Sequence, residues 1–190
     1  MDFFRNYIND MCDKIAAVDM SMLDEATRLL ISGHQKGGKV IIAGNGGSAS
    51  IASHVSVDLT KNTGITAINF NEADLITCLA NDFGYGQWIV KALEFYANHN
   101  DTLILISSSG QSENIIHAAQ KAHQMGLRLI TFSGFSPDNS LISMGQINFW
   151  VNSQSYNIVE MTHHIWLMAM VDKLIEDVKC KAVVYQVNLQ

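Results

Sequence analysis

One short segment of this chain is rich in serine. Residues 107–112 read SSSGQS, with four serines and no lysine or arginine. Hydroxyls, backbone N–H groups and a helix N-terminus can hold a phosphate monoester without a cationic side chain. A single serine would be enough to cap a helix, so the other three exceed that structural role. We therefore expect residues 107–112 to bind a phosphate group.

A second polar segment is rich in glycine. Residues 43–48 read AGNGGS. Glycine lets the backbone approach a ligand closely and adopt positive φ, and the first N–H groups of a following helix favour an anion. The segment matches neither the P-loop pattern nor the GxGxxG spacing, so we expect no nucleotide cofactor. It predicts a ligand-binding loop, and a tight strand-to-helix turn is the structural alternative.

Histidines and carboxylates form a third group of candidates. His54 and Asp58 are four residues apart, so they share one face of a helix. Glu160 and His164 have the same spacing later in the chain. A carboxylate can orient and charge an imidazole for proton transfer, although such pairs are structural as often as catalytic. The adjacent His163 would face away from His164, so we expect only one of these two histidines in a site.

The elements that must position these residues are predicted by apolar periodicity. Five apolar runs lack clean alternation, which is typical of parallel strands covered on both faces. The segments between them have helical spacing, so the chain predicts an α/β fold with a three-layer, doubly wound, five-stranded parallel sheet. Both polar segments follow a predicted strand and open a helix, where ligands bind in such sheets. The predicted strands are Lys39–Ala43, Ile65–Phe70, Thr102–Ser107, Leu127–Phe132 and Ile147–Val151.

Two helical stretches lie outside this alternation. Residues 3–34 predict a long amphipathic arm or a pair of helices, packed against the sheet or against another subunit. Residues 157–177 predict a helix with a buried middle. The tail, residues 180–190, is expected to be a strand or loose chain. We expect one domain over residues 1–190, with a helical arm (1–35), an α/β core (36–178) and a tail (179–190).

Composition limits the class of protein. The chain has 190 residues, of which 48% are hydrophobic and 16% charged, which excludes intrinsic disorder for most of it. The net charge of −6 argues against a nucleic-acid-binding face. We expect no membrane span and no signal peptide, because no long apolar run is present. Three cysteines without a CxxC pair argue against a cysteine zinc site and indicate a reducing cytoplasm.

Together, AGNGGS after the first strand and SSSGQS after the third resemble the SIS (sugar isomerase) domain family. NDFGY at residues 81–85, together with His54 and Asp58, makes the chain similar to the phosphoheptose isomerase branch. The resemblance implies a five-stranded parallel sheet and a homotetramer with sites between subunits. It also implies isomerisation of sedoheptulose 7-phosphate to a heptose 7-phosphate, for lipopolysaccharide or capsule synthesis.

The resemblance further implies roles for individual residues. The implied catalytic residues are Asp58, Glu160 and His164. Some members bind zinc, and the corresponding ligands here are His54, Asp58, Glu160 and His164. The implied substrate-binding residues are Asn45, Gly46, Ser48 and Asp82 for the sugar and Ser107, Ser108, Ser109 and Ser112 for the phosphate.

The chain departs from the family pattern in its last helix. Asp58 stands where a glutamate is usual, so its side chain is one methylene shorter. The pattern QExH, with a second histidine eight residues after the glutamine, is incomplete: the distal position is Leu167 or Met168, depending on the register. His164 is the obvious substitute. A non-catalytic SIS module that binds a phosphosugar and acts through a protein partner, as a replication-initiator-associating relative does, therefore stays open as an alternative.

Overall fold

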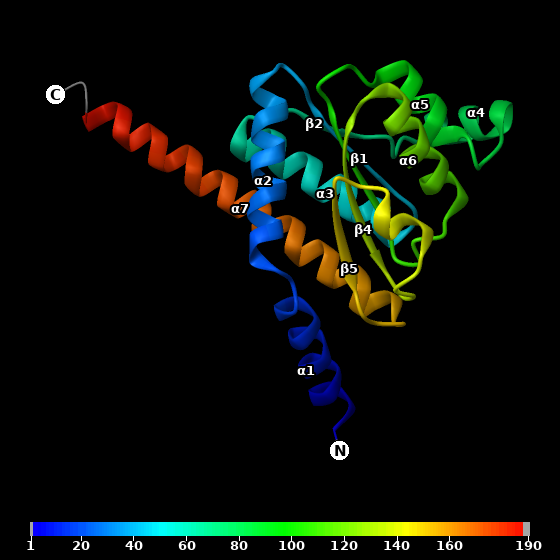
Figure 1. Ribbon diagram of the computed structural model, residues 1–190, viewed down its shortest axis with the longest axis horizontal. Coiled ribbons are helices and arrows are strands. Elements are labelled where there is room, and N and C mark those ends of the chain that lie inside the picture. The colour runs from blue at the N-terminus through cyan, green and yellow to red at the C-terminus, as the bar shows by residue number, and fades with distance from the viewer. Residues whose placement is uncertain (1, 188–190) are drawn as a thin grey trace.

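The computed structural model describes the backbone of residues 2–187 and the side chains as far as Val178. Five parallel strands form one sheet in the order β2-β1-β3-β4-β5, with helices on both sides (Figure 1). The predicted three-layer, five-stranded parallel sheet is confirmed. The strands are β1 (Val40–Gly44), β2 (Ala67–Asn69), β3 (Thr102–Ser107), β4 (Arg128–Gly134) and β5 (Ile147–Val151).

Successive side chains of the central strands enter opposite layers. Val40 and Ile42 of β1 pack with α2, α3 and α7, whereas Ile41 and Ala43 pack with α4, α5 and α6. This two-sided burial explains why the strands read as continuous apolar runs. The helices are α1 (Phe3–Ala16), α2 (Met20–Gln35), α3 (Gly47–Asp58), α4 (Ala73–Phe83), α5 (Trp88–Tyr96), α6 (Glu113–Met125) and α7 (Tyr156–Val187).

The N-terminal segment is a pair of helices. Asp2 caps α1, and the side chain of Asp19 caps α2 by accepting from the Ser21 N–H at 2.9 Å. α2 buries Leu30 against the sheet, whereas α1 buries none of its residues. α1 runs along α7, where the indole N–H of Trp166 donates to the backbone carbonyl of Ile15 at 2.9 Å. Of the two helices, α2 therefore belongs to the layer beside the sheet.

α7 is longer than the sequence predicted. It extends past residue 177 to Val187, so the prediction of a strand or loose chain is wrong for residues 180–187. No glycine or proline interrupts residues 156–187, and adding one more residue to an existing helix needs no new nucleus. Residues 188–190 of the predicted tail lie outside the described residues. No helix in the described part of the chain is long and apolar enough to cross a membrane.

Candidate active site

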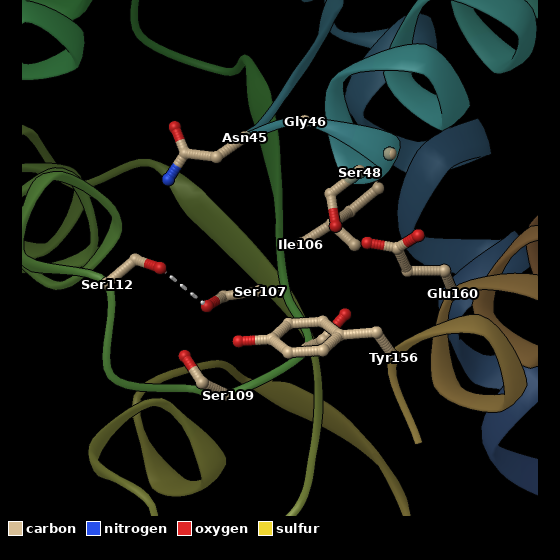
Figure 2. Close-up of a pocket in the computed structure, with 11 residues that line it drawn as sticks. Asn45, Gly46, Ser48, Ile106, Ser107, Ser109, Ser112, Tyr156 and Glu160 are labelled. Carbon is tan, nitrogen blue, oxygen red and sulfur yellow. Dashed lines mark hydrogen bonds between the residues drawn. The ribbon is translucent and has the colours of Figure 1, made fainter. Parts of the chain in front are cut away.

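The two polar loops meet because β1 and β3 are neighbours in the sheet. Gly44 at the end of β1 pairs in register with Ile106 of β3. The order of strands reverses between β1 and β3, and ligands of open α/β sheets bind at the carboxyl ends beside such a switch point. A pocket of about 270 Å³ opens between the loops, with Tyr156 and Glu160 of α7 closing another side (Figure 2). We call it the serine-loop pocket.

The serine loop, residues 107–112, is shaped by its own hydrogen bonds. Gly110 has a φ of 63° and donates its N–H to the backbone carbonyl of Ser107 at 2.9 Å. The hydroxyl of Ser107 donates to that of Ser112 at 3.2 Å (Figure 2). Ser112 precedes α6 but makes no side-chain cap hydrogen bond. The first N–H groups of α6 are therefore left without a serine cap, which suits them to an anion.

All four serines predicted to hold a phosphate line this pocket. The hydroxyl of Ser108 is buried and has no hydrogen-bond partner among the described residues. A buried hydroxyl without a partner is costly, and a ligand oxygen in the pocket would satisfy it. Ser109 accepts the N–H of Gln111 at 3.2 Å and holds the turn. The donor set, all neutral hydroxyls and N–H groups, suits a phosphate monoester.

The glycine-rich loop lines the opposite side of the pocket with Asn45, Gly46 and Ser48. Gly46 has φ 55° and ψ −121°, a conformation that a residue with a Cβ rarely adopts. This turn starts α3 immediately after β1. Three of the four residues predicted to line the sugar, all except Asp82, therefore lie at the pocket.

Glu160 is the carboxylate that the fold brings into this pocket. Its carboxyl group lies against Gly47, the first residue of α3, so closely that a Cβ at Gly47 would overlap it. Burial raises the pKa of Glu160 above its ordinary value. A half-buried carboxyl group with a raised pKa, facing a polar pocket, is suited to accept and return a proton.

His54, Asp58 and His164 form a separate group, which we call the histidine cluster. Nδ1 of His54 lies 2.9 Å from Nε2 of His164, and Nε2 of His54 lies 3.5 Å from a carboxylate oxygen of Asp58. Burial, and then the charge of His54, lower the pKa of His164. His54 and His164 line an apolar hollow with Met161, outside the serine-loop pocket. His164 therefore pairs with His54 rather than with Glu160.

This arrangement bears on the predicted zinc ligands. Asp58 and His164 approach opposite nitrogens of the His54 ring, so one ion bound by that ring cannot reach both of them. Glu160 lies in the other pocket. Among the described residues, no three histidine, cysteine, aspartate or glutamate side chains are grouped so that they could hold a metal ion. The four predicted ligands do not fit a zinc ion in this arrangement.

Comparison with known proteins agrees with the fold and the loops. The sequence of residues 3–134 matches the protein-family model described as SIS domain. The chain belongs to the SIS domain family. It is 32% identical to a phosphoheptose isomerase of Thermodesulfovibrio yellowstonii over 166 residues, which are 84% of this chain and 82% of that protein.

Two further SIS-domain relatives are informative. The chain is 37% identical to a phosphoheptose isomerase of Helicobacter pylori strain P12 over 119 residues, covering 60% of this chain and 62% of that protein, less than two-thirds of either. The solved structure of a phosphoheptose isomerase from Francisella tularensis superposes with a TM-score of 0.81 at 26% identity, covering 92% of this chain and 95% of that one. Because α7 has 32 residues and 92% of the chain is covered, the likeness to this solved structure includes part of α7.

His163 and Asp82 both lie outside the serine-loop pocket. His163 is fully buried, and its Nε2–H donates to the backbone carbonyl of Ser133 at 2.9 Å. Burial lowers the pKa of His163 to about 4, so it is a neutral core residue. Asp82 is exposed at the end of α4 and accepts from the side chain of Asn81 at 3.0 Å. The structure does not bring Asp82 to the serine-loop pocket.

Sequence reasoning missed two residues of this SIS domain. Tyr156 starts α7 and lines the pocket, and its ring packs edge-on against Phe135 at a centroid distance of 4.8 Å. Its spacing of four residues from Glu160 was the available signal, because both side chains then share one face of α7. Asn114, in the first turn of α6, is 2% exposed and bonds to Asn45. A polar side chain just after the serine loop was the signal for Asn114.

Proposed function

We propose that this SIS-domain protein is an aldose–ketose isomerase of phosphorylated sugars. The proposed substrate is sedoheptulose 7-phosphate and the product is a heptose 7-phosphate for surface polysaccharide synthesis. The single observation that carries the reaction class is Glu160, a carboxyl group with a raised pKa, facing a pocket lined by four serines. The relatives named phosphoheptose isomerase support the choice of sugar.

The proposed reaction begins with the phosphate in the serine loop and C1 of the ketose beside Glu160. The carboxylate takes a proton from C1, the electron pair forms the C1–C2 double bond, and the C2 oxygen gains a proton, which gives an enediol. Glu160 then returns a proton to C2 while the C1 hydroxyl loses its own and becomes the aldehyde. The raised pKa of Glu160 favours this return, because the carboxyl group releases its proton near neutral pH more reluctantly than an exposed glutamate.

The hydroxyl protons need a second group, and we keep His164 and Asp58 as the proposed residues. Glu160 and His164 are one turn apart on the same face of α7. A sugar that extends from the serine loop along α7 would meet Glu160 first and His164 next. Because its pKa is lowered, His164 is neutral near pH 7 and can both accept and donate a proton. Asp58 would act by orienting His54, which contacts His164.

We also propose that the protein assembles as a homotetramer with sites between subunits. Phe3, Phe4 and Ile8 of α1 are exposed, as are Met161 and Ile165 of α7 beside the histidine cluster. Phe4 and Ile8 are one turn apart on α1, and Met161 and Ile165 are one turn apart on α7. Exposed apolar side chains grouped in this way favour association. A second copy that covers Met161 and Ile165 would enclose the histidine cluster and reduce the access of water to it. No step of the proposed reaction runs through zinc.

A proton NMR time course of sedoheptulose 7-phosphate with the purified protein tests the function. New anomeric signals of an aldoheptose phosphate are expected, and none with Glu160→Gln. The same course with added zinc tests whether a metal contributes. If the phosphorus signal of the substrate broadens without any turnover, sedoheptulose 7-phosphate is not the substrate, and the protein is a phosphosugar-binding module or an isomerase of a different ketose phosphate.

A further inference from the structure

Two asparagines join the loops that form the serine-loop pocket. Nδ2 of Asn45 donates to Oδ1 of Asn114 at 3.0 Å, and Nδ2 of Asn114 donates back to Oδ1 of Asn45 at 2.9 Å. We call this reciprocal pair the amide clasp. Asn45 follows β1, and Asn114 lies in the first turn of α6, just after the serine loop. The clasp therefore ties the sugar side of the pocket to the phosphate side.

The clasp couples the orientation of the Asn45 amide to that of Asn114. Oδ1 of Asn45 also accepts the hydroxyl of Tyr85 at 3.1 Å, so both of its acceptor positions are occupied. One hydrogen of Nδ2 is used by Asn114, and the other remains. Figure 2 shows the nitrogen of Asn45 turned toward the serines and its oxygen turned away from them. Asn45 therefore presents a single N–H donor, and no acceptor, to the pocket.

Reversal of the Asn45 amide alone is unfavourable because of Asn114. A flipped amide would set N–H against N–H and oxygen against oxygen across the clasp. Asn114 is 2% exposed, so water cannot replace the lost bonds. A buried polar group left without its partner costs about 1–3 kcal/mol, so Asn45 does not reverse alone. Asn114 would have to reverse with it, and the Tyr85 hydroxyl would have to change from donor to acceptor. Asn114 does not itself line the pocket.

We propose that Asn114 is a positioning residue: it acts through Asn45, holding that amide so that its free N–H donates to an oxygen atom of the bound sugar phosphate. This inference rests on the proposed function for the identity of the ligand. It goes beyond it by assigning Asn45 a donor role only and by naming the residue that imposes it. A sugar phosphate offers hydroxyl, carbonyl and phosphate oxygens, all of which can accept this donor.

The clasp can be tested without any ligand. In the free protein, the Asn45 amide proton that is bonded to Asn114 should exchange with water at least 10-fold more slowly than its geminal partner. In Asn114→Ala, both protons should exchange at the fast rate. Side-chain amide exchange measured by ¹⁵N NMR reports this directly. Equal, fast exchange of both protons in the wild type would overturn the inference, whatever the protein's activity.

A double-mutant cycle tests the link to the ligand. The four proteins are wild type, Asn45→Ala, Asn114→Ala and the double variant, and the readout is the dissociation constant for sedoheptulose 7-phosphate by calorimetry. Asn114→Ala should weaken binding about 10-fold in the wild type, as expected for one lost hydrogen bond, and should have no further effect in the Asn45→Ala protein. Additive effects would overturn the inference and leave the proposed function standing.

A matched control separates positioning from general stability. Asn148 of β5 uses its amide in bonds to Thr131 and Gly145, towards the opposite ends of the strands. Asn148→Ala should lower the melting temperature, as Asn114→Ala does, but leave the dissociation constant and kcat/KM unchanged. If Asn148→Ala weakens binding as much as Asn114→Ala, the effect of Asn114 is merely structural. If the wild type binds but does not turn over sedoheptulose 7-phosphate, the proposed isomerase function with this substrate is wrong. The double-mutant cycle still tests whether Asn114 positions Asn45, because it measures binding alone.

Discussion

The serine-loop pocket and the histidine cluster both lie where α3 meets α7, one at the start of α3 and the other about two turns along it. The backbone sets the pocket, since Gly46 adopts a glycine conformation and Gly47 leaves room for Glu160. Side chains set the cluster, where the side chains of His54 and Asp58 are 51% and 25% exposed. A site built by backbone geometry keeps its shape when one surface side chain changes, whereas a cluster of half-exposed side chains depends on each member.

Substitution of Glu160 should give the largest effect. Glu160→Gln keeps the size of the side chain but removes the proton acceptor, so kcat should fall by about 10²–10⁴-fold, the usual contribution of a positioned acid or base. The dissociation constant for sedoheptulose 7-phosphate should change little, because the serine loop is intact. Steady-state kinetics and calorimetry measure the two quantities. Activity within a few-fold of the wild type would transfer the main catalytic role to the histidine cluster.

The pH dependence of the free energy of unfolding distinguishes His163, in the core, from His164, in the histidine cluster. The pKa of His163 is about 4 in the folded protein and 6.5 ordinarily, so between these values the unfolded chain binds the extra proton. Stability is therefore fully present above about pH 6.5 and lost as the pH falls toward 4, by roughly 3 kcal/mol. Urea unfolding at several pH values measures this loss.

His163→Gln should remove most of that pH dependence, because glutamine can donate to the Ser133 carbonyl without titrating. His164→Gln serves as the control and should leave most of it in place, because His164 is only partly buried. If the free energy of unfolding of His163→Gln falls with pH as steeply as that of the wild type, another group causes the loss of stability in acid.

Gly47→Ala should disturb the pocket without touching the cluster. The new Cβ would overlap the carboxyl group of Glu160 and push it out of position, so kcat should fall by about 10- to 100-fold. Ser50→Ala, on the exposed face of the same helix, is the matched control and should be neutral. If the two variants have equal kcat values, the position of Glu160 is less critical than its charge.

His164→Asn should give the smallest change that is still measurable, a fall in kcat of about 10-fold with an unchanged dissociation constant. The reason is that His164 is proposed to move hydroxyl protons, which water can also carry. His54→Asn should have a similar effect if His54 acts by orienting His164. Neutral outcomes for both variants would assign the cluster a purely structural role.

The sequence was sufficient to predict the sheet and the place of the phosphate loop. Five apolar runs marked the strands, and the three central ones read as continuous runs because they are covered on both faces. The polar loops were placed at one edge by the rule that parallel strands end together. The serine and glycine loops then followed from their own composition, since Gly110 and Gly46 adopt positive φ, which favours glycine.

The remaining part of the site depends on how two helices cross. Whether His164 meets Glu160 or His54 is decided by the packing of α7 against α3, which no periodicity in either helix encodes. Asp82 matched a family motif, yet the end of α4 holds it away from the pocket. Asn114 was hidden for a similar reason, because its partner lies on a different loop.

The amide clasp also has a consequence for the order of folding. Its two asparagines are 69 residues apart in the chain, with α3, β2, α4, α5 and β3 between them. Contacts of such long separation form late, because the entropy of closing the loop must be lost before they add stability. A refolding chain should regain its helix content before it can bind a sugar phosphate. A ligand that binds only the finished pocket would then stabilise the last folding step and no earlier one.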